Sequence, residues 1–379
     1  MPHICHITTS HLPKDTRIFQ RQCRGLVSRG YRVTLLATTP VEEEVDGVRI
    51  LPLPRVGRLG RKFILPRLAA SMALSLKADL YHFHDPELIP WMSILARRHG
   101  AKVVWDAHEL YPDAISEFNF RLFPPVAWGV AILFNFFERE WMKPMAGVVA
   151  VTDPIRSRYD KDGPPTITIR NVIDLDRLPP VTASPSSTDF TILVSGTTNE
   201  SRRISRLIEA FAQVVAQAPQ ARLRLLTHFD SEEARQDIFA NIKRLGVQDK
   251  ISIAPLVSWE ELLGKEVSSA HLGVVFYART KNNLVALPNR LFEYWARGLP
   301  VVATDTPILR SLVGSWGAGL LVDSDSSAAI AKGILHYIEH PEDARRAGVN
   351  GRRAVTEEFN WGKELSKLSS FYERILRNA

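Results

Sequence analysis

The sequence predicts an α/β protein built from two doubly wound, Rossmann-like domains. Short apolar runs alternate with longer segments of 3.6-residue periodicity along the chain, which is typical of repeated βα units and parallel sheets. The length of 379 residues is enough for two domains with separate cores. The Pro- and Ser-rich segment 179–189 interrupts this alternation, so we expect it to link domain 1–180 to domain 190–360.

The first domain opens with a strand over His3–Thr9. A helix follows over Arg17–Ser28, with Asp15 or Thr16 as its N-terminal cap and Gly30 as its stop. Further strands are predicted at Arg32–Ala37, Asp79–His84, Lys102–Ala107 and Gly147–Thr152.

The second domain repeats the pattern. Its predicted strands are Phe190–Gly196, Ala221–Thr227, Lys250–Pro255, His271–Tyr277 and Pro300–Thr304, and its clearest helices are Ile204–Gln217 and Glu232–Leu245. Doubly wound sheets bind ligands at the carboxyl ends of their strands, so we expect a cleft between the strand ends of the two domains. The segment 360–376 is an amphipathic helix.

Composition narrows the class of protein and of partner. An apolar content of 45% with 23% charged residues is that of a soluble globular protein. The net charge of +7 suits an anionic partner, whether nucleotide phosphate, lipid headgroup or nucleic acid. The two cysteines, Cys5 and Cys23, are expected to be buried free thiols in a reducing compartment.

The chain begins directly with a strand pattern instead of a charged region followed by an apolar one, so we expect no secretory signal. The most apolar stretch, 123–137, is too short to cross a bilayer. The expected location is cytoplasmic, with a peripheral position at the inner face of the membrane as a further option.

The most informative segment is 286–305. Pro288 suits the start of a helix, which then continues to a stop at Gly298 and is followed by a buried strand. The N-terminus of such a helix offers N–H groups to an anion, and Glu293, further along, can bind paired hydroxyls such as those of a ribose. This pattern favours a nucleotide-sugar site, and the alternative is an ordinary amphipathic helix.

The same segment closely resembles the donor-site motif of family 4 glycosyltransferases, E-x-x-A-x-G-x-P-V-V-A-T-D. It is matched by Glu293, Ala296, Gly298, Pro300, Val301, Val302, Ala303, Thr304 and Asp305. The resemblance implies the GT-B fold, in which the C-terminal helix, 361–379 here, crosses back onto the N-terminal domain. It also implies transfer, with retention, from a nucleoside-diphosphate sugar, with UDP- and GDP-sugars the first candidates.

The resemblance also assigns donor-site residues. Family members place an Arg after the loop glycine, Gly196 here, and a Lys five residues later; Thr197 and Arg202 occupy these positions, with Arg203 adjacent. Arg202 is therefore the expected diphosphate cation and a catalytic residue together with Glu293. The expected donor-binding set also includes Leu287, Pro288, Asn289 and Arg290. Because arginine and a helix end would neutralise the diphosphate, no metal and no other cofactor is expected.

One departure from the family concerns the sugar-facing end of the motif. The first Glu of the family's E-x7-E pattern is replaced by Val285, so backbone N–H groups around Leu284–Leu287, or Asn289, must contact the sugar instead. Three alternatives remain: a catalytically degenerate nucleotide- or glycan-binding relative, a sugar epimerase on the same fold, and a nicotinamide-dependent oxidoreductase. The last lacks support because no G-x-G-x-x-G opens a helix.

The first domain is the expected acceptor side. Its D-T-R-I-F element resembles a subgroup of the family, with Asp15 as a helix cap and Arg17 directed either to the cleft or to the surface. The segments HFHDPEL and WDAHELYP end two strands and supply the candidates His84, Asp85, Glu87, His108 and Glu109. His108 matches the family's strand-end histidine and would line the reaction centre. A metal site is not favoured, because His82 and His84 share one strand face without tight ligand spacing.

A glycan or a lipid-linked molecule is the expected acceptor. Basic residues between Arg55 and Arg67 and aromatic residues between Phe118 and Trp141 make an anionic membrane surface a candidate partner. The alternative is that the aromatic side chains pack against the sheet. Nucleic acid is not expected, because no recognition motif accompanies the basic residues.

Overall fold

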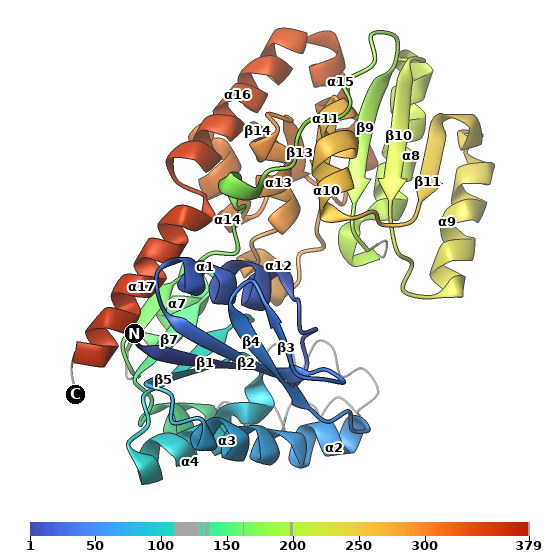
Figure 1. Cartoon of the computed structure of the whole chain (residues 1–379). Coiled ribbons are helices and arrows are strands. Elements are labelled where there is room, and N and C mark those ends of the chain that lie inside the picture. Colours follow the sequence, from blue (N-terminus) through green and yellow to red (C-terminus); the bar gives the residue numbers. More distant parts are fainter. Residues whose placement is uncertain (110–128, 130–131, 133–135, 162, 198–199, 378–379) are drawn as a thin grey trace. The chain divides into compact units, whose positions relative to one another are not determined.

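The computed structural model describes residues 1–109, 129, 132, 136–161, 163–197 and 200–377 (Figure 1). The chain divides into two compact units, one formed by Met1–Asn171 with Trp361–Ala379 and the other by Val172–Asn360. Segment 179–189, the expected linker, belongs to the second unit. Its backbone is held there by Thr182, whose N–H donates to the Gly264 carbonyl at 2.7 Å, and by Arg297, whose guanidinium donates to the Pro179 carbonyl.

The described part of the first unit contains an eight-stranded sheet in the order β3-β4-β2-β1-β5-β6-β7-β8. Its strands are β1 (His3–Ile7), β2 (Arg32–Thr38), β3 (Glu43–Val45), β4 (Val48–Leu53), β5 (Leu80–Phe83), β6 (Val103–Ala107), β7 (Gly147–Ala150) and β8 (Thr166–Thr168). Neighbouring strands are parallel except β3 and β4.

The helical segments of this unit are η1 (Thr16–Cys23), α1 (Arg24–Ser28), α2 (Arg58–Phe63), α3 (Leu65–Ser75), η2 (Pro86–Leu88), α4 (Ile89–His99), α7 (Asp153–Tyr159) and α17 (Trp361–Arg377). The carboxylate of Asp15 accepts the N–H groups of Arg17 and Ile18 at 2.8 and 2.9 Å, so the predicted cap is confirmed. The C-terminal helix α17 packs its apolar face into the core shared with η1, α1 and β2.

The described part of the second unit contains a six-stranded parallel sheet in the order β11-β10-β9-β12-β13-β14. Its strands are β9 (Phe190–Ser195), β10 (Ala221–Leu226), β11 (Ile251–Ala254), β12 (Leu272–Val275), β13 (Val301–Thr304) and β14 (Gly319–Val322). The helical segments are η3 (Leu175–Arg177), η4 (Glu200–Arg202), α8 (Ile204–Gln217), α9 (Glu232–Arg244), η5 (Gln248–Lys250), α10 (Trp259–Glu261), η6 (Leu262–Glu266), α11 (Val267–Ser269), α12 (Lys281–Val285), α13 (Asn289–Ala296), α14 (Pro307–Leu309), η7 (Arg310–Gly314), α15 (Ser327–Glu339) and α16 (Pro341–Glu357).

The two parallel sheets with helices confirm the predicted fold class (Figure 1). Apolar side chains form separate cores on the two faces of the second sheet, which is typical of a doubly wound fold. Cys5 and Cys23 are buried free thiols, as expected, and burial raises the pKa of both. Among the described residues, no helix combines the length and apolar character needed to cross a bilayer.

Candidate active site

Helix α13 is fixed to the carboxyl end of strand β9 by Tyr294. The helix starts after Pro288 and ends before Gly298, whose φ is +70°, as the sequence predicted. The buried hydroxyl of Tyr294 lies 3.2 Å from both the N–H and the Oγ of Ser195. Gly273 leaves room for the Tyr294 ring, because a Cβ at that position would overlap it. The helix N-terminus therefore has a defined place beside the β9 loop.

Arg290 lies one helical turn before Tyr294 and places its guanidinium against Gly196, the first residue after β9. A Cβ at Gly196 would overlap the Nη2 atom of Arg290, so the close approach requires glycine. Gly196 also has a φ of +118°, a backbone conformation that side-chain-bearing residues rarely adopt. The loop after β9 is thus shaped to admit a cation from α13.

A Gly196→Ala substitution tests this arrangement. We expect it to displace the Arg290 guanidinium and to cost on the order of 1–3 kcal/mol of stability through backbone strain. Nucleoside-diphosphate affinity should fall together with stability, measured by calorimetric titration and denaturant unfolding. Gly246→Ala is the matched control, because Gly246 also has a positive φ of 68° but has no atom within 4 Å of an added Cβ. Equal nucleotide affinity in the two variants would contradict this view of Gly196.

Arg202 is the second cation at this loop. Its Cζ lies 4.0 Å from the centroid of the Tyr277 ring, and its buried Nη1 atom makes no hydrogen bond within the described part of the chain. Burial lowers the pKa of Arg202 and Arg290 adds to that shift, whereas Tyr277 and Asp230 oppose it. The two guanidinium groups therefore repel each other across a largely desolvated space, which an anion would stabilise.

The other predicted donor residues differ in their contacts and in their burial. Arg203 adopts a left-handed φ of 54° and forms an ion pair with Asp325 at 2.7 Å. The Oδ1 atom of Asn289 is buried without a hydrogen-bond partner among the described residues. Pro288 is buried, whereas Thr197, Leu287 and Glu293 are half-buried. Val285 ends α12, which is capped by the Thr280 hydroxyl.

In the first unit, strand register gathers a polar cluster on one face of the sheet. His6 on β1 pairs in register with His82 on β5. Phe83 pairs with Trp105 on β6, so His84 and Asp106 follow one position later, on the same face as His82. His6, His82, His84 and Asp106 are all fully buried. His6 Nδ1 lies 3.1 Å from His84 Nε2, and His82 Nδ1 contacts the Tyr372 hydroxyl of α17.

Burial sets the charge states of these imidazoles. Desolvation lowers the pKa of His6 and His82 well below the ordinary value and that of His84 to about 3, although Asp106 opposes each shift. Burial alone would raise the pKa of Asp106, but Arg17 and His108 hold it well below its usual range. The cluster therefore combines neutral imidazoles with one ionised carboxylate.

Arg17 lies neither at the surface nor free in a cleft. Its Nε and Nη2 atoms donate to the two oxygens of Asp106 at 3.0 and 2.8 Å, and its Nη1 donates to the Ile169 carbonyl at 3.1 Å. Only 4% of the residue is exposed. The expectation of a surface arginine was wrong, because a buried carboxylate two strands away needs its charge.

Asp85 and Glu87 hold the loop after β1. Asp85 Oδ2 accepts the N–H of Thr9 at 2.6 Å and the hydroxyl of Thr8 at 2.7 Å, and Oδ1 lies 3.0 Å from His11 Nδ1. Glu87 Oε1 accepts the hydroxyls of Thr9 and Ser10, both at 2.9 Å. These two carboxylates therefore shape loop 8–11. Of the remaining predicted residues, His108 is half-buried and Glu109 is exposed.

Comparison with known proteins gives this geometry a family context. Residues 16–177 match the model of "Glycosyltransferase Family 4", and residues 182–354 match that of "Glycosyl transferases group 1". The phosphatidyl-myo-inositol mannosyltransferase of Mycobacterium leprae is 24% identical over 364 residues, covering 92% of this chain and 89% of that protein. This chain is a glycosyltransferase of the GT-B type.

Solved structures share its fold over the whole length. The sucrose-phosphate synthase of Thermosynechococcus elongatus matches with a TM-score of 0.79 at 19% identity, covering 100% of both chains. The HepE protein of Anabaena, in complex with UDP-glucose, matches with a TM-score of 0.74 at 15% identity, covering 98% of this chain and 99% of its own. Both likenesses concern the fold of the glycosyltransferase and do not identify its substrates.

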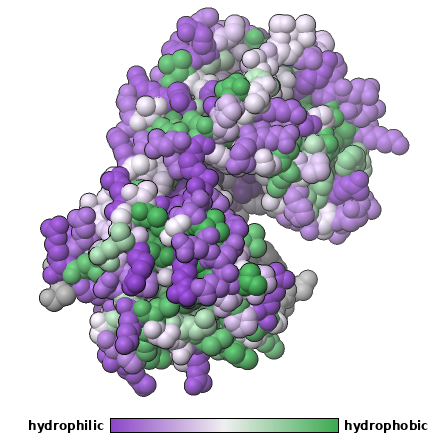
Figure 2. Space-filling model, viewed as in Figure 1, coloured by the Kyte–Doolittle hydropathy of each residue, from purple (hydrophilic) through white to green (hydrophobic). Residues whose placement is uncertain are grey.

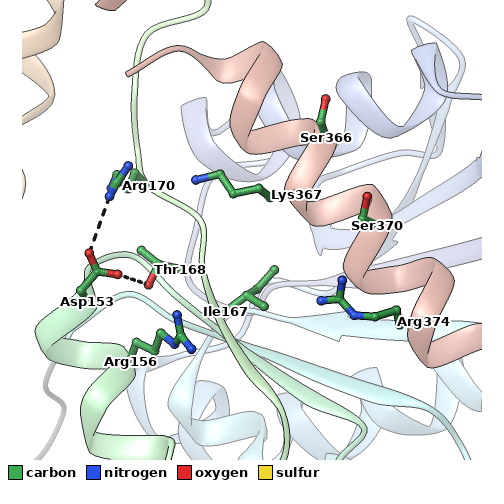
Figure 3. A pocket seen from close by; sticks show the side chains of 9 residues that line it. All are labelled: Asp153, Arg156, Ile167, Thr168, Arg170, Ser366, Lys367, Ser370 and Arg374. Atoms are coloured by element: carbon green, nitrogen blue, oxygen red, sulfur yellow. Dashed lines mark hydrogen bonds and ion pairs between the residues drawn. The ribbon is translucent and has the colours of Figure 1, made fainter. Parts of the chain in front are cut away.

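A polar pocket of about 480 Å³ lies elsewhere in the first unit of the glycosyltransferase, between α17 and the β8 edge (Figure 3). Arg156, Arg170, Lys367 and Arg374 are the cations that line it. Acids nearby balance much of this charge: Asp153 lies 3.6 Å from Arg170, and the buried Glu364 contacts both Arg170 and Lys367. None of the sequence-predicted site residues lines this pocket, so we regard it as separate from the candidate site.

Asp106 is the main residue of the cluster that the sequence reasoning missed. The sequence predicts Asp106 only as part of the strand Lys102–Ala107, separately from the neighbouring histidines. The sequence did contain a signal for a buried ion pair. A lone acid inside an otherwise apolar strand is almost never fully buried unless it is paired, so Asp106 indicated a nearby cation. His6 and Tyr372 were missed for a different reason, since only the sheet register and the packing of α17 bring them to this point.

Proposed function

We propose that this glycosyltransferase transfers a sugar from a nucleoside-diphosphate sugar to an acceptor hydroxyl with retention of anomeric configuration. The observation that carries the proposal is the convergence of Arg202 and Arg290 on the glycine loop after β9, beside the N-terminus of α13. Two neighbouring guanidinium groups fit a diphosphate, because they can stabilise the charge that develops as the leaving group departs.

The remaining donor contacts follow from their places on α13. Glu293 lies one turn beyond Asn289 and would bind the ribose hydroxyls of the nucleotide. The unpartnered, buried Oδ1 of Asn289 is the side-chain atom best suited to replace the sugar contact that a Glu at the Val285 position would have made. His108, at the end of β6, would line the reaction centre, where the leaving phosphate assists attack from the same face. This account neutralises the diphosphate without a metal ion.

The substrates are proposed at the level of class. The HepE structure contains UDP-glucose, and the named mycobacterial relative is a phosphatidyl-myo-inositol mannosyltransferase. UDP- and GDP-sugars are therefore the donors to test first. Lipid-linked molecules and glycans are the acceptors to test first. The product would be a polysaccharide, a glycolipid or another glycoconjugate. We propose that the enzyme works in the cytoplasm, either free in solution or bound peripherally to the inner face of the membrane.

A thermal-shift panel tests the donor class. UDP, GDP, ADP, CMP and dTDP, each with matching sugar donors, are compared with NAD. We expect a clear rise of Tm with one nucleoside diphosphate and none with NAD, because ligand binding to the folded state stabilises it in proportion to ln(1 + [L]/Kd). A shift with NAD alone would overturn the proposal. Donor binding without transfer to any acceptor would instead favour the degenerate binder, and interconversion of the donor sugar would indicate an epimerase.

We also propose contact with an anionic membrane through the basic segment around α2. The exposed fractions of Leu59, Phe63 and Ile64 are 73%, 69% and 64%, and the exposed cations Arg61 and Lys62 lie between Leu59 and Phe63 in the sequence. Figure 2 shows hydrophobic residues among hydrophilic ones over this part of the first unit. A short helix with exposed apolar and cationic side chains is suited to the headgroup region of a bilayer.

The aromatic residues proposed for the same role divide into two groups. Phe118, Phe120, Phe123, Trp128 and Phe134 lie outside the described residues. Phe136 and Phe137 are 62% and 43% exposed, and the Phe137 ring stacks on Trp141 with centroids 5.3 Å apart. These two exposed rings are compatible with membrane contact, whereas Trp141 is partly covered.

The membrane proposal predicts a measurable effect of Phe63. Substitution Phe63→Ser should lower binding to anionic vesicles at low salt roughly ten-fold, because burying a Phe side chain contributes about 1.5–3 kcal/mol. Sedimentation with phosphatidylglycerol-containing vesicles gives the measurement. Phe239→Ser is the matched control, since Phe239 is a 44% exposed aromatic residue on α9 in the second unit. Equal loss in both variants, or no vesicle binding by the parent protein, would refute the proposal.

A further inference from the structure

We propose that His84, Asp106 and His108 form a binding site for a zinc-type divalent cation in the first unit. One atom from each residue meets the other two: His84 Nδ1 lies 3.4 Å from His108 Nε2, His84 Nδ1 lies 3.4 Å from Asp106 Oδ2, and His108 Nε2 lies 3.5 Å from Asp106 Oδ2. The three potential ligand atoms thus form a nearly equilateral triangle. This site does not depend on the proposed donor chemistry.

The size of the triangle favours coordination over hydrogen bonding. Nitrogen and oxygen ligands held about 2.0–2.2 Å from a tetrahedral zinc ion are separated from one another by about 3.4 Å. Strong hydrogen bonds between such atoms are shorter, about 2.7–3.2 Å. All three observed separations exceed that range and agree with the edge of a zinc tetrahedron.

The surroundings supply the second layer of contacts that metal ligands normally have. When His84 coordinates through Nδ1, its Nε2–H is free to donate to His6 Nδ1, which lies 3.1 Å away. Asp106 is oriented by two neighbours. Gln22 Nε2 and Arg17 Nε donate to Oδ2, the proposed ligand atom, at 2.7 and 3.0 Å, and Arg17 Nη2 donates to Oδ1 at 2.8 Å. These contacts fix the ring orientation of His84 and the position of the carboxylate before any ion binds. Two imidazole ligands beside one carboxylate favour Zn²⁺ over Mg²⁺ or Ca²⁺, which prefer sets of oxygen ligands.

The proposed metal site can be reached from the side of His108, and it leaves one coordination position open. Its side chain is 17% exposed, whereas those of His84 and Asp106 are fully buried, so the triangle has one face toward the surface of the unit. Three protein ligands leave the fourth position of a tetrahedral ion for water or for an oxygen atom of a ligand. The site therefore has the ligand number, the supporting contacts and the entry route expected of a metal centre that binds a small molecule.

A second group of histidines must be distinguished from this one. Nitrogen atoms of His6, His82 and His84 also lie close to one another and form a second possible ligand set. All three of these side chains are fully buried, so no ligand of this set is exposed at the surface of the unit, and none of the three is a carboxylate. We therefore assign the ion to the set with His108 and Asp106, and this assignment revises the expectation from sequence that no metal binds.

Metal content tests the assignment on the full-length, untagged chain. The protein is stripped with a chelator, incubated with Zn²⁺ or Co²⁺ and gel-filtered; the bound metal is then counted by elemental analysis, and the Co²⁺ form is examined by visible absorption. His108→Ala removes a proposed ligand that is partly exposed, so its folding is at little risk. His82→Gln alters the neighbouring buried histidine that belongs only to the alternative set. Circular dichroism verifies the fold of each variant.

We expect the parent chain and His82→Gln to bind a single ion with the intense Co²⁺ bands of a tetrahedral site, and His108→Ala to lose both. The proposal is overturned if the parent chain takes up no stoichiometric Zn²⁺ or Co²⁺. It is equally overturned if His108→Ala retains the ion, or if His82→Gln folds and loses it while His108→Ala does not. Should His82→Gln not fold, the comparison of the parent chain with His108→Ala decides alone.

Discussion

Replacing Arg290 by alanine is expected to lower kcat/KM for the sugar donor by about 10²–10³-fold, the usual effect of removing one group that stabilises developing charge. Arg202→Ala should have an effect of the same order. The reason is that the two guanidinium groups lie close together beside Gly196, where each raises the energy of the other and a diphosphate would relieve the repulsion. The matched control is Arg206→Ala, which removes a 51% exposed arginine paired with Glu209 on α8.

The double variant gives a sharper result than either single one. Because both cations would bind one diphosphate, the loss in Arg202→Ala with Arg290→Ala should be smaller than the sum of the two single losses in free energy. Calorimetric titration of nucleoside diphosphate and steady-state kinetics measure this coupling. Strictly additive effects would indicate that the two arginines contact different ligands.

Stability without ligand separates a binding role from a structural one. Arg290 lowers the pKa of Arg202, which means that the two charges repel each other in the free protein. Arg290→Ala should therefore leave the Tm of the ligand-free chain unchanged or slightly higher, while removing most of the stabilisation that nucleoside diphosphate gives. A large fall of Tm without ligand would show that Arg290 mainly supports the fold.

Sequence periodicity predicted most of the sheet but not all of it. Strands such as β9 and β13 are continuous apolar runs, typical of the centre of a parallel sheet. Strand β4 was not predicted, because Pro52 interrupts its apolar pattern. Strand β8 was not predicted either, because three residues are too few to show periodicity. The limits of α13 were predicted well, since both Pro288 and Gly298 are strong local signals.

The candidate site was predictable where it depends on local sequence. Gly196, Arg202 and Arg290 are assigned by the resemblance to the family motif, whose positions run along one strand-loop-helix unit and one later helix. What remained hidden depends on contacts between distant segments, such as Arg17 with Asp106, which are 89 residues apart. No pattern within either segment reveals that partnership, because the β-strand register and the orientation of η1 decide it together.

The Arg17–Asp106 pair carries the largest expected effect on stability. Arg17→Met should lower the free energy of unfolding by about 3–5 kcal/mol, the usual loss when one partner of a buried pair is removed and the other charge is left without compensation. Denaturant unfolding of the chelator-treated chain measures it. Arg24→Met is the control on the same helical segment, since the Arg24–Asp46 pair has side-chain exposures of 28% and 47% and should contribute about 0–1 kcal/mol.

The pH dependence of this difference identifies its cause. Burial raises the pKa of Asp106, but Arg17, His108 and His84 together hold it well below its usual range. In the parent chain the carboxylate therefore adds stability above the unfolded pKa of about 3.9 and loses it as pH falls through the lower folded pKa. Without Arg17, burial prevails and the folded pKa rises, so protonation relieves the unpaired charge. The difference in the free energy of unfolding between the parent chain and Arg17→Met should therefore be full at neutral pH and narrow as pH falls toward the unfolded pKa. The histidines of the cluster are common to both proteins and largely cancel in this difference, so a gap that stays constant with pH would mean that lost packing, and not the Asp106 charge, causes the destabilisation.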